Sequence, residues 1–162
     1  MEVSAVEHRL RGGLTAWATA SAVGGAVLHL AGRIADDPVV RAAGTQTVLW
    51  AAVDAALAQG GAVRAARAAL GLPGSAPPTA ERLRGLLLVN SALDVVYVAA
   101  GAALAARPTT APRWLRWPDR SGVQLRGHGL AVVVQGLALL VLDARAAGRL
   151  SPEPPPRGPR TR

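Results

Sequence analysis

Two acidic side chains stand inside long apolar stretches of this sequence, and they decide which chemistry is open to it. Asp54 and Asp94 are each the only formally charged residue of their stretch. Charged groups in hydrocarbon are costly, so they usually turn inward and mark functional sites. An unpaired carboxylate in such a place takes up a proton, and we expect at least one of the two to be neutral near neutral pH. Such a group could relay protons, receive a cationic ligand or act as a general acid.

Other large polar side chains accompany the aspartates at intervals of three, four or eight residues. These intervals place the side chains on one face of each helix. The candidate residues of a polar ligand-binding pocket are Gln46, Trp50, Asp54, Asn90, Asp94, Tyr97, Gln135 and Asp143. The competing interpretation is structural: the same groups hydrogen-bond to one another and hold the helices together. Both interpretations stay open from the sequence.

Four apolar stretches must position these side chains. They cover about 12–32, 42–63, 85–106 and 127–148. Each is close to the ~20 residues that cross ~30 Å of hydrocarbon as a helix, and lipid favours a helix because it cannot satisfy free backbone groups. The expected fold is therefore all-α: a bundle of four transmembrane helices over residues 1–150, followed by a disordered Pro- and Arg-rich tail at 151–162. An alanine-rich soluble bundle is the alternative.

The depths of the polar residues can be estimated from the 1.5 Å rise of a helix. Asp54, Asp94 and Ser21 fall together, roughly 12–14 Å from one membrane edge. Three further layers are expected. They are Trp17, Asn90 and Asp143 nearer that edge; Trp50, Tyr97 and Gln135 near the middle; and His29, Gln46 and His128 toward the opposite edge.

The charge pattern predicts the partner and the orientation. All 18 basic residues are arginines, the net charge is +8, and the arginines flank the apolar stretches. Trp114 and Trp117 lie among the arginines of 107–126, a mixture expected at a membrane surface. This favours a lipid bilayer as the partner and argues against nucleic acid. Eleven arginines lie on the side of the two termini and seven on the other, which predicts cytoplasmic termini. The composition is typical of a GC-rich genome. We expect a multi-pass membrane protein, in a bacterial inner membrane as the family resemblance described below implies; a homodimer is also considered.

Several kinds of site are argued against by the residues present. The chain has no cysteine, so disulfides and thiolate metal sites are excluded. His29 and His128 have no closely spaced second ligand, so no metal site is expected. The glycines form no phosphate-binding loop, and no cofactor is expected. No residue can be assigned a catalytic role, and whether the protein is an enzyme is left open.

The sequence contains a candidate internal repeat. Arg-Leu-Arg-Gly occurs at 9–12 and again at 82–85, and each copy leads into an apolar stretch. Two stretches separate the copies, so both halves would insert in the same orientation as a parallel repeat. Chance similarity in a chain rich in Ala, Leu, Gly and Arg is the competing explanation. If the two halves are aligned as a repeat, Trp17 corresponds to Asn90, Ser21 to Asp94 and Trp50 to Gln135.

Taken in order, these motifs resemble a widespread bacterial family of small four-span membrane proteins of unknown function. The resemblance covers about 9–149 and implies a fold but no activity. The motifs that carry it are Trp17 to Gly25, Gln46-x-x-x-Trp50-x-x-x-Asp54, Asn90-x-x-Leu93-Asp94-x-x-Tyr97, and Arg126-Gly-His-Gly129 with Gln135-Gly136 and Asp143.

Three functions are compatible with the sequence. The first is binding or transport of a small polar or cationic ligand or of protons at the polar cluster. The second is a membrane enzyme that uses Asp54 or Asp94 as a general acid on a lipid-like substrate such as a prenyl chain, with indoles stabilising positive charge. The third is a structural subunit of a membrane complex.

Overall fold

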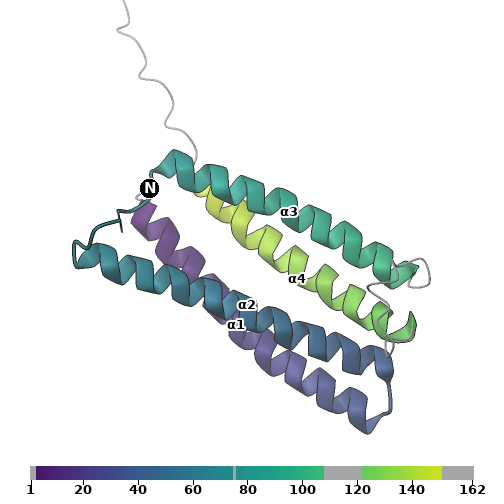
Figure 1. The fold of residues 1–162 in the computed structure, drawn as a ribbon. Coiled ribbons are helices and arrows are strands. Elements are labelled where there is room, and N and C mark those ends of the chain that lie inside the picture. The colour runs from purple at the N-terminus through teal and green to yellow at the C-terminus, as the bar shows by residue number, and fades with distance from the viewer. Residues whose placement is uncertain (1–2, 75, 108–121, 151–162) are drawn as a thin grey trace, which may run out of the picture.

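The computed structural model describes residues 3–74, 76–107 and 122–150, which form four helices. They are α1 (Val3–Ile34), α2 (Pro38–Ala69), α3 (Ala80–Ala106) and α4 (Gly122–Arg149). Figure 1 shows them running lengthwise in one bundle, with successive helices in opposite directions. The prediction of an all-α four-helix bundle is confirmed, and each predicted apolar stretch lies within one helix. The proposed tail at 151–162 and the tryptophans expected at the membrane surface, Trp114 and Trp117, lie outside the described residues.

Three of the four helices are long and apolar enough to cross a membrane: α1, α3 and α4. α2 is as long as α1, at 32 residues, but it does not reach the same hydropathy. Its first half carries Thr45, Gln46 and Thr47 in a row, and Asp54 follows. Four membrane spans were predicted, and three of the four helices meet the length and hydropathy of a membrane span. α2 packs against both α1 and α4, which is where its polar residues find partners.

Short-range signals fix the turn between α1 and α2. Asp37 caps α2, its carboxylate accepting hydrogen bonds from the backbone N–H of Val39 at 2.8 Å and of Val40 at 3.1 Å. Pro38 follows at the first helical position, where its missing N–H is not needed. Asp36 has φ of +49°, a left-handed conformation that reverses the chain within three residues. α1 and α2 are therefore held as an antiparallel hairpin.

Glycines bring the helices into backbone contact at the end of the bundle that holds this turn, called here the tight end. Within the α1–α2 hairpin, a Cβ on Gly25 would lie 3.0 Å from the carbonyl oxygen of Gly44. Within the α3–α4 hairpin, a Cβ on Gly101 would lie 2.9 Å from that of Gly129. Small residues permit this close approach of helices in lipid. A close glycine contact of this kind thus occurs within each hairpin.

The opposite end, called here the open end, is packed differently. The buried core cluster there joins α1, α3 and α4 and contains no residue of α2; its members are Val6, Leu83, Leu87, Ala146, Ala147 and Leu150. A Cβ on Gly12, Gly60 or Gly85 would meet nothing within 4 Å. The C-terminal part of α2 is therefore less tightly held than its beginning.

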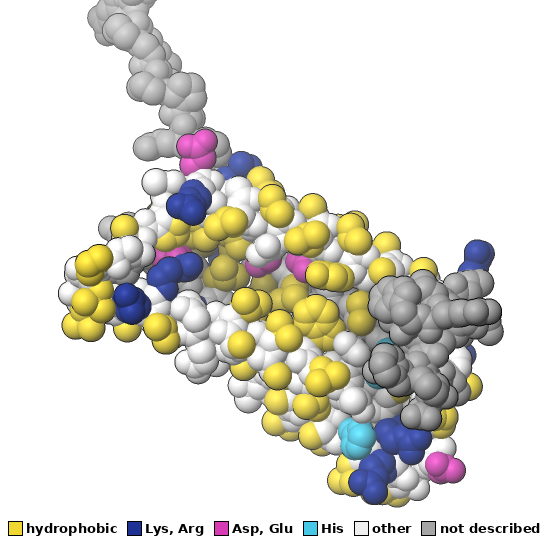
Figure 2. Space-filling view, viewed as in Figure 1, with side chains coloured by type: hydrophobic (Ala, Val, Ile, Leu, Met, Phe, Trp, Pro, Cys, Tyr) yellow, Lys and Arg dark blue, Asp and Glu magenta, His cyan; other side chains and the backbone are white. Residues whose placement is uncertain are grey.

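The outer surface is apolar along the middle of the bundle and basic at its ends. Large aliphatic side chains on the helices are well exposed, for example Val27 at 62% and Val96 at 60%. Figure 2 shows apolar side chains over the middle of one face and arginines gathered toward the ends. Of the described arginines, eight lie at the open end and four at the tight end. An apolar belt between two charged ends suits a helix bundle that lies in lipid.

Candidate functional site

Gln135 lies at the centre of a hydrogen-bonded chain that joins three helices. The indole Nε1 of Trp17 on α1 donates to Oε1 of Gln135 on α4 at 2.9 Å. Nε2 of Gln135 in turn donates to Oδ2 of Asp54 on α2. Gln135 is 3% exposed and Asp54 is completely buried. The amide of Gln135 thus uses its acceptor for Trp17, 118 positions earlier in the chain, and its donor for Asp54, 81 positions earlier.

The fourth helix contributes Asp94, which is 4% exposed. Asp94 lies near enough to Asp54 for the two carboxylates to interact electrostatically. Gly136 on α4 lets α3 pack closely against α4 at this level, because a Cβ there would lie only 3.2 Å from the backbone oxygen of Asp94. Asp143 on α4 lies near enough to Asp94 and to Asn90 to interact with both. The structure therefore places Asp94 within electrostatic reach of both Asp54 and Asp143.

Four buried polar atoms in this region have no hydrogen-bond partner among the described residues. They are Ser21 Oγ, Trp50 Nε1, Asp54 Oδ1 and Asp94 Oδ2. A buried polar atom without a partner costs free energy, and nearly all such atoms in folded proteins are satisfied. Several together on facing helices are therefore the expected lining of a place where a ligand, an ion or water binds. The residues Ser21, Trp50, Asp54 and Asp94 with their bridging partner Gln135 are called the polar centre below.

Two aromatic rings flank the polar centre between α2 and α3. Trp50 and Tyr97 meet edge to face, with 5.8 Å between ring centroids and 67° between ring planes. The helices themselves make little contact here, because α3 packs mainly on α4. Tyr97 is 42% exposed, so this ring pair forms one side wall of the polar centre toward the surface of the bundle. In Figure 2, acidic side chains are visible in a hollow within the apolar middle of the bundle.

A second polar layer lies nearer the tight end, and its groups are paired. His128 Nδ1 and Gln46 Oε1 lie 3.0 Å apart and join α4 to α2. His29 Nδ1 lies 2.9 Å from the hydroxyl of Thr45, which also lies 3.0 Å from the carbonyl oxygen of Arg41. This pair joins α1 to α2. Gln46, a candidate pocket residue, belongs to this layer and not to the polar centre.

The expected depth layers are reproduced in part. Trp50 meets Tyr97, Asn90 meets Asp143, and Gln46 meets His128, as their depths suggested. Trp17 was expected beside Asn90 and Asp143, yet its indole reaches Gln135 instead. The indole is long enough to cross a helical turn, which a depth estimated from backbone rise ignores. Trp17 and Ser21 were absent from the list of candidate pocket residues, although their predicted depths placed them close to it.

These features define a class of protein: an all-helical bundle in which three helices are long and apolar enough to cross a membrane, with a buried polar centre that is incompletely paired among the described residues. The chain belongs to a family of unknown function, DUF6992, whose model matches residues 13–144. The match extends over every residue of the polar centre. No curated protein and no solved structure matches the chain significantly.

Proposed function

We propose that the protein is a multi-pass membrane protein that binds a proton or a small ammonium-type cation at Asp54 and Asp94. The observation that carries this proposal is the pair of buried carboxylate oxygens, Asp54 Oδ1 and Asp94 Oδ2, that lack a partner on facing helices. No ion pair to either carboxylate occurs among the described residues. A cation between them would complete both and remove their mutual repulsion.

The aromatic side chains favour an organic cation or a proton over a hard metal ion. Trp50 and Tyr97 stand in edge-to-face contact on two facing helices, and aromatic faces attract ammonium groups. Among the described residues, no group of three or more His, Cys, Asp or Glu is arranged to hold a metal ion. The unpaired hydroxyl of Ser21 offers an additional oxygen acceptor for an N–H donor.

The membrane placement forms part of the proposal. Eight described arginines at the open end against four at the tight end favour the open end, with both termini, in the cytoplasm. The composition suggests a bacterial inner membrane. Because four helices leave a narrow lumen, transport through the site would require a homodimer or a change in helix packing, whereas binding alone requires neither.

Carboxyl labelling tests the site. Dicyclohexylcarbodiimide, a lipid-soluble reagent, modifies protonated carboxyl groups, and mass spectrometry locates the adduct in protein reconstituted in liposomes. We expect labelling at Asp54 or Asp94, protection by methylammonium, and none at Asp36, which is exposed in the turn at the tight end. Labelling of all three aspartates to the same extent, without protection, would reject the proposal.

Isosteric variants separate binding from a purely structural role. Asp54→Asn keeps an oxygen that accepts from Gln135 Nε2, so we expect the bundle to persist while methylammonium protection at Asp94 is lost. Asp36→Asn is the matched control and should leave protection unchanged. If Asp54→Asn and Asp94→Asn both bind methylammonium as the wild type does, the carboxylates hold the helices together and bind no cation.

A membrane enzyme is the second candidate, and a groove between α1 and α4 favours it. The groove has a volume of about 560 Å³, is wide open to the side and is apolar except for Trp17, whose indole leads through Gln135 to Asp54. A lipid-like substrate such as a prenyl chain could lie there with its reacting end toward the carboxyl. Turnover of added prenyl lipids that disappears in Asp54→Asn would support this candidate over cation binding.

The third candidate, a structural subunit of a larger membrane complex, predicts a different result. Asp94→Asn would then lower the yield of an assembled complex purified from membranes, with no change in ligand binding or turnover. Unchanged assembly in Asp94→Asn would count against it.

A further inference from the structure

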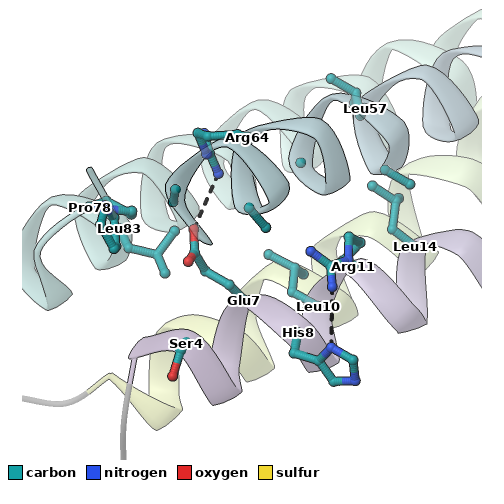
Figure 3. Close-up of a pocket in the computed structure, with 15 residues that line it drawn as sticks. Ser4, Glu7, His8, Leu10, Arg11, Leu14, Leu57, Arg64, Pro78 and Leu83 are labelled. Carbon is teal, nitrogen blue, oxygen red and sulfur yellow. Dashed lines mark hydrogen bonds and ion pairs between the residues drawn. The ribbon is translucent and has the colours of Figure 1, made fainter. Parts of the chain in front are cut away.

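A cleft of about 400 Å³ opens at the open end, on the side where α2 is absent from the core cluster. It is bordered by the first turns of α1, the last turns of α2 and the start of α3 (Figure 3). Its lining falls into two groups. The charged and polar side chains are Ser4, Glu7, His8, Arg11 and Arg64; the large apolar ones are Leu10, Leu14, Leu57 and Leu83.

Two arginines from opposite helices border the mouth of the cleft. Arg64 on α2 reaches back to α1, where its Nη2 lies 3.2 Å from Oε1 of Glu7. Arg11 on α1 extends toward α2, and its Cδ would lie 3.9 Å from a Cβ built on Gly61. Nη2 of Arg11 also lies 3.2 Å from Nδ1 of His8 (Figure 3). The Arg64 side chain is 58% exposed, so it can turn toward a ligand without leaving a buried position.

The inner part of the cleft is apolar. Leu14 lies seven residues beyond Glu7 on α1, which is about 10 Å along the helix axis. Leu57 lies the same distance below Arg64 on α2, and both leucines line the cleft. The lining thus changes from cationic at the helix ends to aliphatic toward the middle of the bundle. A phospholipid has the same order of parts: its charged head group would lie by the arginines at the helix ends, and its acyl chain by the leucines further in.

We propose that this cleft binds an anionic phospholipid, with its phosphate between Arg11 and Arg64 and an acyl chain along Leu10, Leu14 and Leu57. Arginine suits phosphate because its fork of N–H donors matches the phosphate oxygens. Basic pockets at the ends of membrane helices bind anionic head groups in this way. The aliphatic inner part favours a lipid over free phosphate. This site is separate from the polar centre, and neither proposal depends on the other.

Binding of short-chain lipids to the full-length protein in detergent tests the proposal, with native mass spectrometry as the measurement. Dioctanoyl-phosphatidylglycerol should bind saturably, at least about tenfold more tightly than dioctanoyl-phosphatidylcholine, because a choline cation would sit next to the arginines. Inorganic phosphate alone should not compete at equal concentration. Equal binding of both lipids, or displacement of the anionic lipid by inorganic phosphate, would overturn the proposal.

Charge variants locate the site. Arg11→Gln and Arg64→Gln together should weaken phosphatidylglycerol binding by at least about tenfold. The control is Arg33→Gln with Arg41→Gln, two arginines at the tight end, which should leave binding unchanged. A matching thermal midpoint of the two double variants shows that both are folded. Unchanged binding in the first pair, or an equal loss in the control pair, contradicts the assignment.

Glu7→Gln gives a result that a structural salt bridge would not. The carboxylate of Glu7 competes with the lipid phosphate for Arg64, so its removal should tighten phosphatidylglycerol binding by several fold. If the ion pair served only to hold α1 against α2, the same substitution would loosen the cleft and weaken binding. Weaker or unchanged binding in Glu7→Gln therefore counts against the lipid site.

Discussion

The two ends of the bundle contain similar residues but pack in opposite ways. At the tight end, Gly25, Gly44, Gly101 and Gly129 place one helix backbone directly against another. At the open end, glycines just as regular in the sequence, such as Gly12 and Gly60, meet open space. Connection length does not explain the difference. At the tight end, three residues join α1 to α2 but fifteen, 107–121, join α3 to α4, whereas ten, 70–79, join α2 to α3 at the open end. Glycine content alone therefore does not predict where helices touch.

The hydrogen bonding of the polar groups also differs between the two ends of the bundle. Near the tight end, His29 and His128 are paired with Thr45 and Gln46. Further along, the polar centre keeps four atoms without a partner, and beyond it the bundle opens into a cleft. Where backbones touch, side chains have fixed neighbours and their hydrogen bonds can be completed within the chain. The atoms without a partner among the described residues therefore lie between this paired layer and the cleft at the open end.

A leucine at position 44 should break the tight end and have the largest effect. A Cβ on Gly44 would press against the backbone of His29 and would lie 2.6 Å from the carbonyl oxygen of Gly25. Backbone atoms cannot move aside as a side chain can, so we expect Gly44→Leu to lower the free energy of unfolding by about 3 kcal/mol or more. Unfolding by sodium dodecyl sulfate, followed by circular dichroism, measures the change. A stable Gly44→Leu protein would mean that this contact does not hold the hairpin.

Removing the bridging amide tests whether the polar centre also supports the fold. Gln135→Leu leaves Trp17 Nε1 and Asp54 Oδ2 without their partners, and we expect a loss of about 2 kcal/mol. The matched change in the paired layer, Gln46→Leu, breaks one contact to His128 and should lose about 1 kcal/mol. The same unfolding titration compares the two. A larger loss of stability in Gln46→Leu than in Gln135→Leu would show that the paired layer, and not the polar centre, contributes more to the fold.

The substitution Gly60→Ala tests the packing of the open end, as Gly44→Leu tests that of the tight end. Gly60 lies in the interior of α2, and a Cβ there meets nothing within 4 Å. Gly60→Ala should therefore raise the free energy of unfolding by about 1 kcal/mol, because alanine restricts the unfolded chain and favours helix. Destabilisation by Gly60→Ala would show that the open end packs as closely as the tight end.

The smallest effect on stability is expected at the mouth of the cleft. The Glu7–Arg64 ion pair is partly exposed to solvent, with 58% of the Arg64 side chain and 25% of the Glu7 side chain accessible. Exposed ion pairs contribute little, so Glu7→Gln should change the free energy of unfolding by less than about 0.5 kcal/mol. Thermal unfolding in detergent checks this value. A loss above about 1 kcal/mol would make the pair a structural clamp and weaken its interpretation as part of a ligand site.

The helices and their polar faces could be read from the sequence because both are local. Apolar stretches of about 20 residues lie within α1, α2, α3 and α4. The start of α2 is marked by Asp37, whose side chain accepts hydrogen bonds from the backbone just after it, and by Pro38. Hydropathy is less decisive for α2, one of the four predicted spans, which does not reach the hydropathy of α1, α3 and α4. Its polar residues Gln46 and Asp54 contact His128 and Gln135 on α4, and the sequence of α2 alone does not show these partners.

Residue types and periodicity determined that this chain forms helices, that most of their surface suits lipid, and which residues each helix turns to one face. These properties depend on neighbours within a few residues. The tertiary structure alone decided that Gln135 joins Trp17 to Asp54 and that Arg64 meets Glu7, 57 positions away. Such pairs depend on how each helix rotates and crosses the others. Rotation and crossing are set by contacts between side chains and glycine backbones far apart in the chain, such as Gly25 with Gly44.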